Sequence, residues 1–211
     1  MKKVEVKGMQ LSNLSSVEML KNAYDLYDSE NMSVILALTA HTILSGENEP
    51  AVKDVFERAD LTYVEDPEIT DIIGVSALLF FDKFIVRSVE NKKSIFVVAS
   101  DNESLNKILD YISLKLDDIF SPEGKYVLTE KEDDFDNLAN EINSVSPDLV
   151  LCIMPSPVRE YFLSENALKL DCRVWYGPDF DYLTRDESDG FVKRIKSALR
   201  RGRIKTHIKE G

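Results

Sequence analysis

The sequence predicts an α/β protein built on a Rossmann-like, doubly wound and mainly parallel sheet with flanking helices. Short apolar runs alternate with amphipathic helical stretches along the 211 residues, which is typical of this class. The run at 94–99 is apolar on both faces, as expected of a strand buried inside a parallel sheet. Polar residues gather just after several of the predicted strands. A small N-terminal hairpin and a basic C-terminal helix complete the predicted architecture.

The N-terminal segment predicts a hairpin followed by a helix. Residues 2–7 alternate polar and apolar side chains and turn at Gly8 into a second strand at 9–14. Residues 15–18, Ser-Ser-Val-Glu, have the spacing of a capping box, which marks a helix start. The packed side of this helix is predicted to carry Val17, Leu20, Tyr24 and Tyr27.

Residues 33–66 predict a strand–helix–strand unit. Its first strand is 34–38, and residues 45–48 are rich in turn-forming types. Pro50 suits the first position of a helix, whose inward face carries Ala51, Val52, Val55 and Phe56. A second strand at 59–64 then delivers Glu65 and Asp66 to its carboxyl end.

The rest of the chain continues the alternation. The apolar stretch 69–91 is compatible with one long helix or with two helices separated near Gly74. Residues 100–103 are expected to cap the helix that follows the strand at 94–99. Further strands are predicted at 125–128, 149–154 and 173–176, and further helices at 133–145 and 159–168.

Composition excludes several classes of protein. Hydrophobic residues make up 44% of the chain and charged residues 30%, as in ordinary globular proteins. No run has the length and apolarity of a membrane span, and residues 1–8 lack the apolar centre of a signal peptide. The two cysteines lie in strand-like stretches, which predicts free core thiols. The chain has two histidines and no Cys-x-x-Cys, which predicts no metal cluster. Together these features lead us to expect a cytoplasmic protein. Phosphate-loop and dinucleotide glycine motifs are absent, and we expect no cofactor.

The charge is distributed unevenly. Residues 191–211 carry eight Lys or Arg against one Glu, a net +7, so the overall −12 leaves −19 on residues 1–190. We expect one α/β domain at 1–183 and a hinge with a basic appendage at 184–211, whose helix is predicted at 191–201. An acidic body argues against nucleic acid as a partner. The basic appendage suggests docking on an anionic membrane surface or an acidic protein face; the alternative is a solubilising helix with a disordered basic tail.

Polar residues follow the predicted strands at their carboxyl ends, where ligands bind in open α/β sheets. They are Thr39 and His41 after one strand, Glu65 and Asp66 after another, Ser156, Arg159 and Glu160 after a third, and Asp179 and Asp181 after a fourth. This shared position predicts a ligand site at one edge of the sheet.

The order of these segments resembles the WecG/TagA/CpsF glycosyltransferase family across nearly the whole chain. The similar segments are 11–15, 37–40, 59–61, 93–100, 146–150, 157–160 and 177–181. The resemblance implies transfer of an N-acetylhexosamine, typically N-acetylmannosamine, from a UDP-sugar with inversion of stereochemistry. The implied acceptor is a polyprenyl-diphosphate-linked sugar in cell-surface polysaccharide synthesis.

The resemblance also assigns roles to residues. Where the family has Pro-Asp-Gly, this chain has Val-Glu-Asp at 64–66, so Glu65 is the implied catalytic base, or Asp66 if the match shifts by one residue. The implied substrate-binding residues are Thr39, in place of a family asparagine, Arg159, and the retained Glu160 and Asp181. No metal ligand is implied.

Departures from the family pattern lead to two hypotheses. The first is a divergent glycosyltransferase, peripheral at the inner face of the cell membrane. The second is a catalytically inactive relative, a pseudoenzyme that binds or assembles with a partner such as an active paralogue or a second copy. The first predicts a cleft open to Glu65, Arg159 and Asp181 together, and the second a plug formed by Ile153 or Met154. Asp66 adds a negative charge that would repel a diphosphate, and the family's glycines are missing from 153–156.

Overall fold

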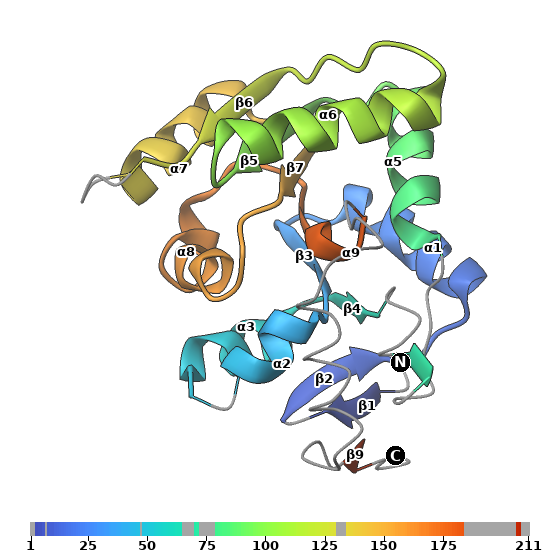
Figure 1. Ribbon diagram of the computed structural model, residues 1–211, viewed down its shortest axis with the longest axis vertical. Helices are drawn as coiled ribbons and strands as arrows, with labels where there is room; N and C mark the ends of the chain where they lie inside the picture. Colours follow the sequence, from blue (N-terminus) through green and yellow to red (C-terminus); the bar gives the residue numbers. More distant parts are fainter. Residues whose placement is uncertain are drawn as a thin grey trace.

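The computed structural model describes residues 3–6, 8–46, 48–64, 70–71, 79–129, 134–183 and 206–207. Its main sheet has six strands in the order β4-β3-β8-β7-β5-β6, and every pairing in it is parallel (Figure 1). The strands are β3 (Ser33–Ala37), β4 (Leu61–Tyr63), β5 (Ile95–Ala99), β6 (Gly124–Val127), β7 (Leu149–Cys152) and β8 (Val174–Gly177). The predicted Rossmann-like α/β fold is confirmed.

Helices cover both faces of this sheet. One face packs against α3 (Pro50–Arg58), α7 (Asp134–Val145) and α8 (Val158–Asn166), which lie on the left in Figure 1. The other face packs against α1 (Ser16–Asp25), α5 (Phe80–Glu90) and α6 (Asn102–Leu116). Side chains alternate between the two cores along each strand, so Trp175 of β8 joins the first core and Tyr176 the second. All five residues of β5 are buried, which explains its uninterrupted apolar run.

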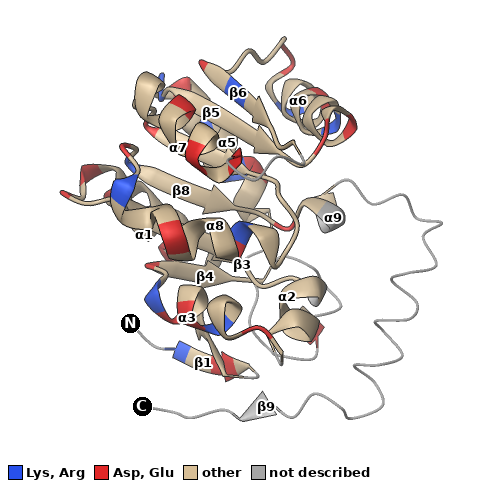
Figure 2. Cartoon of the chain, turned by 90° about the vertical axis from the view of Figure 1, so that its left-hand side faces the viewer, with Lys and Arg blue, Asp and Glu red and all other residues tan. Residues whose placement is uncertain are grey.

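The N-terminal hairpin forms a separate small sheet. Strands β1 (Lys3–Val6) and β2 (Met9–Ser12) pair antiparallel, and β1 lies below α3 and β4 in the view of Figure 2. The backbone of β9 (Thr206–His207) adds to the free edge of β1. The turn uses Gly8 at φ 84°, a conformation that glycine adopts without strain. Ser12 joins the hairpin to β4, because its N–H donates to Thr62 Oγ1 at 3.0 Å and the Thr62 N–H donates to Ser12 Oγ at 3.2 Å.

The first helix confirms one expectation and corrects another. Ser15 and Glu18 form the predicted capping box at the start of α1. Val17 does not lie on the packed side, since 79% of it is exposed, and Met19 and Ala23 are buried instead. The buried side of α1 is therefore the side that carries Met19 and Ala23, which are four residues apart and so lie one above the other on the helix.

Short helices lie beside the predicted turns or at the ends of predicted helices. They are α2 (Ala40–Ser45), α9 (Phe180–Leu183) and the 3₁₀ helices η1 (Leu26–Asp28) and η2 (Ala167–Lys169). In the apolar stretch 69–91, helix α5 begins at Phe80 after Leu79, which has φ 59°. Residues 72–78, the hinge at 184–190 and the predicted basic helix at 191–201 lie outside the described residues. In the described part of the chain, no helix is both long and apolar enough to cross a membrane.

Candidate functional site

The connections of the main sheet define a topological switch point between β5 and β7. Strand β5 leads through α6 to β6 on one side, and β7 leads through α8 to β8 on the other. Because parallel crossovers are right-handed, connections that run in opposite directions place α6 and α8 on opposite faces. The carboxyl ends of two such strands leave a crevice, which is where ligands bind in doubly wound sheets.

A cavity of about 120 Å³ lies at this switch point. Its walls come from the segments that follow β3, β5, β7 and β8 and from the first turns of α6 and α8. The lining residues are Thr39, His41, Ser100, Ser104, Ile153, Met154, Pro155, Ser156, Arg159, Pro178, Asp179 and Phe180. The structure thus brings polar residues from three of the four predicted strand ends into one place, which we call the switch-point cavity.

The residues assigned from the sequence have different positions relative to this cavity. Thr39 and Arg159 line it, and Glu160 is buried beside Arg159. Asp181 belongs to α9, one residue after the lining residue Phe180. Glu65 and Asp66 lie outside the described residues.

Arg159 and Glu160 form a buried ion pair at the start of α8. The Arg159 Nε and Nη2 groups donate to Glu160 Oε1 at 3.0 and 2.8 Å, and Nη1 donates to the carbonyl of Pro178 at 3.3 Å. The side chains are 2% and 0% exposed. Burial lowers the pKa of Arg159, but the negative charge of Glu160 outweighs it, so the pKa is raised and the guanidinium stays charged. Glu160 Oε2 is buried, and no described residue donates a hydrogen bond to it.

Gly177, the last residue of β8, lets this guanidinium lie against the backbone. A Cβ atom at position 177 would lie 2.8 Å from both Cδ and Nη1 of Arg159, too close for a van der Waals contact. The sequence indicated only a turn at 177–179. A glycine directly before a proline gave no sign that an arginine from another segment would occupy the space of its missing side chain.

Thr39 caps the short helix α2. Its Oγ1 accepts from the Thr42 N–H at 3.1 Å, and Thr42 Oγ1 accepts from the Thr39 N–H at 2.7 Å. This reciprocal arrangement is a capping box with threonine at both positions. Thr42 Oγ1 donates to the Thr39 carbonyl at 2.8 Å, so the Thr39 hydroxyl is the donor in the longer 3.4 Å contact between the two Oγ atoms. A ligand acceptor at a shorter distance can replace that contact without loss of the helix cap.

Ser100 and Ser104 were not among the predicted site residues. The Oγ atoms of both donate to Asp101 Oδ2, at 3.1 and 3.0 Å, and the Ser104 N–H donates to Asp101 Oδ1 at 2.7 Å. These bonds, led by the one from the Ser104 backbone, lower the pKa of Asp101. The capping sequence at 100–103 directly follows a central strand, and this signal would have identified Ser100 and Ser104 as candidate site residues.

Ser156 has a different environment from the other hydroxyls of the cavity. Its Oγ atom is buried and makes no hydrogen bond to the described protein. Since buried hydroxyls are normally paired, an unpaired one in a cavity wall is free to bind a polar ligand atom. The neighbouring Ile153 and Met154 are buried and supply an apolar wall.

The described residues therefore offer a ligand the hydroxyls of Thr39 and Ser156 and the guanidinium of Arg159. The carboxylate of Glu160 neutralises the charge of this guanidinium. Within the described ranges, no cluster of His, Cys, Asp and Glu could hold a metal ion. This chemistry suits hydrogen bonding to a polar organic molecule.

The fold and the site define a class: an α/β protein with a doubly wound parallel sheet and a small polar cavity at its switch point. No family model matches the chain, and no curated protein does so either.

Proposed function

We propose that the chain is a divergent relative of the WecG/TagA/CpsF glycosyltransferases that binds a UDP-sugar at the switch-point cavity. In this proposal it transfers an N-acetylhexosamine, with inversion, to a polyprenyl-diphosphate-linked sugar. One observation carries the proposal: Thr39 and Arg159, assigned to the nucleotide sugar from segments far apart in the sequence, line the same cavity. That cavity lies where doubly wound sheets bind their ligands.

The proposed roles follow from the hydrogen-bonding capacity of each group. Arg159 has five N–H donors, and three of them donate to Glu160 and Pro178. The other two make no hydrogen bond to the described residues, and we assign them to a phosphate oxygen. Thr39 donates its hydroxyl proton, Glu160 holds Arg159 in place, and Asp181 contributes from α9. Glu65 or Asp66 is the proposed base that deprotonates the acceptor hydroxyl.

A second candidate function is a non-catalytic relative that binds or assembles with a partner. The small cavity favours it, because 120 Å³ is below the roughly 300–1,000 Å³ of typical small-molecule sites. Ile153 and Met154 both line the cavity and are buried, as expected of a plug. The proposed partner is a second copy of the chain or an active paralogue.

Calorimetry with UDP-N-acetylmannosamine and UDP-N-acetylglucosamine tests the first proposal. The informative variant is Ser156→Ala, because it removes a cavity hydroxyl that bonds to nothing in the described protein. One lost hydrogen bond of about 1 kcal/mol should weaken binding roughly fivefold. The matched control is Ser164→Ala, an exposed serine on α8, the helix that follows Ser156; its Oγ donates to the Tyr161 carbonyl.

The outcomes separate the two candidates. No detectable binding of either nucleotide sugar to the wild type at millimolar concentration would sink the glycosyltransferase proposal. Binding that weakens in Ser156→Ala but not in Ser164→Ala supports it. Binding without transfer to a lipid-linked acceptor, together with a stable homo-oligomer in light scattering, supports the non-catalytic relative.

We further propose that the basic appendage, residues 191–211, attaches the protein to the anionic inner face of the cell membrane. Its net charge of +7 supports electrostatic adsorption, at about 1 kcal/mol per basic residue near such a surface. The full chain should co-sediment with anionic vesicles and not with neutral ones, and added salt should release it. Equal retention by both kinds of vesicle would reject this account.

A further inference from the structure

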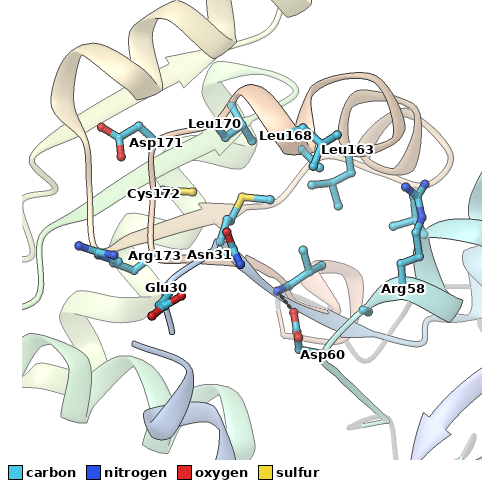
Figure 3. Close-up of a pocket in the computed structure, with 15 residues that line it drawn as sticks. Glu30, Asn31, Arg58, Asp60, Leu163, Leu168, Leu170, Asp171, Cys172 and Arg173 are labelled. Atoms are coloured by element: carbon cyan, nitrogen blue, oxygen red, sulfur yellow. Dashed lines mark hydrogen bonds between the residues drawn. The ribbon is translucent and has the colours of Figure 1, made fainter. Parts of the chain in front are cut away.

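A second cavity lies at the opposite edge of the sheet, at the amino ends of β3, β4 and β8 (Figure 3). Its volume is about 400 Å³, and its walls come from the segments that enter these strands together with parts of α3, α8 and η2. We call it the amino-edge cleft. It shares no lining residue with the switch-point cavity, so it is a separate place in the fold.

One side of the amino-edge cleft is apolar. Val55 of α3 and Leu163 of α8 line it and are buried, and the lining residue Val34 of β3 is half-buried. At the rim, Leu168 of η2 is fully exposed, at 103%. Figure 3 shows the leucines gathered on one side of the cleft. A leucine that projects from a concave apolar surface offers contact area to an apolar molecule placed there.

The charged side chains of the cleft have an excess of carboxylates. Arg58 is already paired with Asp54 on the same helix. Asp60 and Asp171 each accept one hydrogen bond, from the Val34 N–H at 2.8 Å and from Ser146 Oγ at 2.6 Å, which leaves their negative charges in place.

Glu30 and Arg173 complete this set. Neither side chain makes a hydrogen bond or ion pair with another described residue, and both lie at one end of the cleft in Figure 3. Because Arg58 is paired with Asp54, the other charged lining residues are three carboxylates and one guanidinium. They are Glu30, Asp60, Asp171 and Arg173.

We propose that the amino-edge cleft binds a small amphipathic cation, a compact molecule with an apolar body and a protonated nitrogen. The apolar body would cover Leu168 and its buried neighbours, and the nitrogen would lie near Glu30 and Asp60. The volume falls within the roughly 300–1,000 Å³ of small-molecule sites. A protein partner would need a surface of about 800 Å² on each side, which suits a broad face rather than a concave cleft.

The test uses three probes with the same eight-carbon chain: octylammonium, octanol and octanoate. Calorimetry with the full chain at pH 7 and low salt measures their affinities. Octylammonium should bind most tightly and octanoate least, by about fivefold at each step, because exposed ion pairs contribute modestly. Octanoate binding as tightly as octylammonium would overturn the proposal.

Two variants separate the apolar and ionic contributions. Leu168→Ser should weaken all three probes by roughly fivefold, since it removes contact area. The double variant Glu30→Gln with Asp60→Asn should bring the affinities for octylammonium and octanoate together. The amide introduced by Asp60→Asn keeps an oxygen that can accept from the Val34 N–H, and both positions are exposed, so the fold is preserved.

Matched controls come from the outer side of α6. Leu114→Ser replaces a leucine that is 76% exposed, and Asp110→Asn removes an exposed carboxylate one turn earlier. Neither residue lines the cleft. Both controls should bind the probes as the wild type does; equal losses in Leu168→Ser and Leu114→Ser would show non-specific adsorption and reject the site.

Discussion

Arg159 directs two of its nitrogens, Nε and Nη2, at the same oxygen of its neighbour Glu160, and the second carboxylate oxygen has no hydrogen-bond partner among the described residues. The pair is buried and neutral as a unit. Removing one member would leave a single charge in the protein interior, which is far more costly than removing both.

The first prediction follows from this pairing. Arg159→Met and Glu160→Gln should each lower the free energy of unfolding by about 3–5 kcal/mol, because each leaves an uncompensated buried charge. The double variant should be more stable than either single variant. Urea denaturation of the four proteins completes a double-mutant cycle and gives the interaction energy.

Additive losses in that cycle would contradict the finding that the two residues stabilise each other. The cycle also bears on ligand-binding experiments. An Arg159 single variant that fails to bind a nucleotide sugar has two explanations, lost contact and lost stability, whereas Ser156→Ala leaves the pair intact.

The second prediction concerns Gly177. Alanine at this position places a methyl group 2.8 Å from Arg159 Cδ and Nη1, so the guanidinium must move. We expect a loss of about 1–3 kcal/mol in the free energy of unfolding, typical of overpacking. In the background of Arg159→Met with Glu160→Gln the same change should cost less, since methionine is flexible. An equal cost in both backgrounds would mean that Arg159 is not the obstacle.

The third prediction concerns alkaline pH. Burial raises the pKa values of the Cys152 and Cys172 thiols from 9.0 to about 12. Between these values the unfolded chain loses thiol protons that the folded chain keeps, so stability falls as pH rises, by at most about 1.4 kcal/mol per pH unit for each thiol.

Urea denaturation at pH 8, 9.5 and 11 measures this fall. In Cys172→Ala the fall should be smaller than in the wild type, because one of the two thiols no longer contributes. Parallel curves for the two proteins would refute the assignment. Both cysteines are free and buried, as the sequence predicted, so a thiol reagent at pH 8 should react no faster than the protein unfolds.

The fourth prediction concerns acidic pH and Asp148, which joins the amino ends of β5 and β7. Burial raises the pKa of Asp148, but the hydrogen bonds from Ser94 and the interaction with Lys93 outweigh it and lower the pKa below 3.8. Its stabilising contribution is therefore present at neutral pH and is lost as pH falls below about 4.

Asp148→Asn should consequently cost about 1 kcal/mol at pH 7 and much less at pH 3. Denaturation at the two pH values measures both differences. A cost that does not change with pH would show that the carboxylate charge is not what stabilises this junction.

The fold was predictable because burial in a parallel sheet leaves a strong sequence pattern. The run at 94–99 and the Pro50 helix start both match observed elements, β5 and α3. Helices α2 and α9 were missed because they are too short to show a period. The usual capping box is a serine or threonine followed three residues later by glutamate or glutamine. In α2 the second position is Thr42, so the start of this helix did not match that motif.

The candidate site was predictable only in part. Strand ends indicated Thr39 and Arg159, because carboxyl ends of parallel strands meet at one edge. The burial of Arg159 against Gly177 depends on how two distant segments pack, which local sequence does not encode. The amino-edge cleft is formed by irregular segments without periodic side chains, so no pattern in the sequence pointed to it.

Trp175 is the single tryptophan of the chain, and its position gives the protein a built-in optical probe. It is fully buried, stacks on Phe162 at a centroid distance of 5.2 Å and pairs in register with Val34, which lines the amino-edge cleft. Two residues further along β8, Gly177 meets Arg159. The fluorescence emission of native Trp175 should therefore lie at short wavelength. A shift of this emission would report changes around β8, caused from the amino-edge cleft or from the switch-point cavity, without an added label.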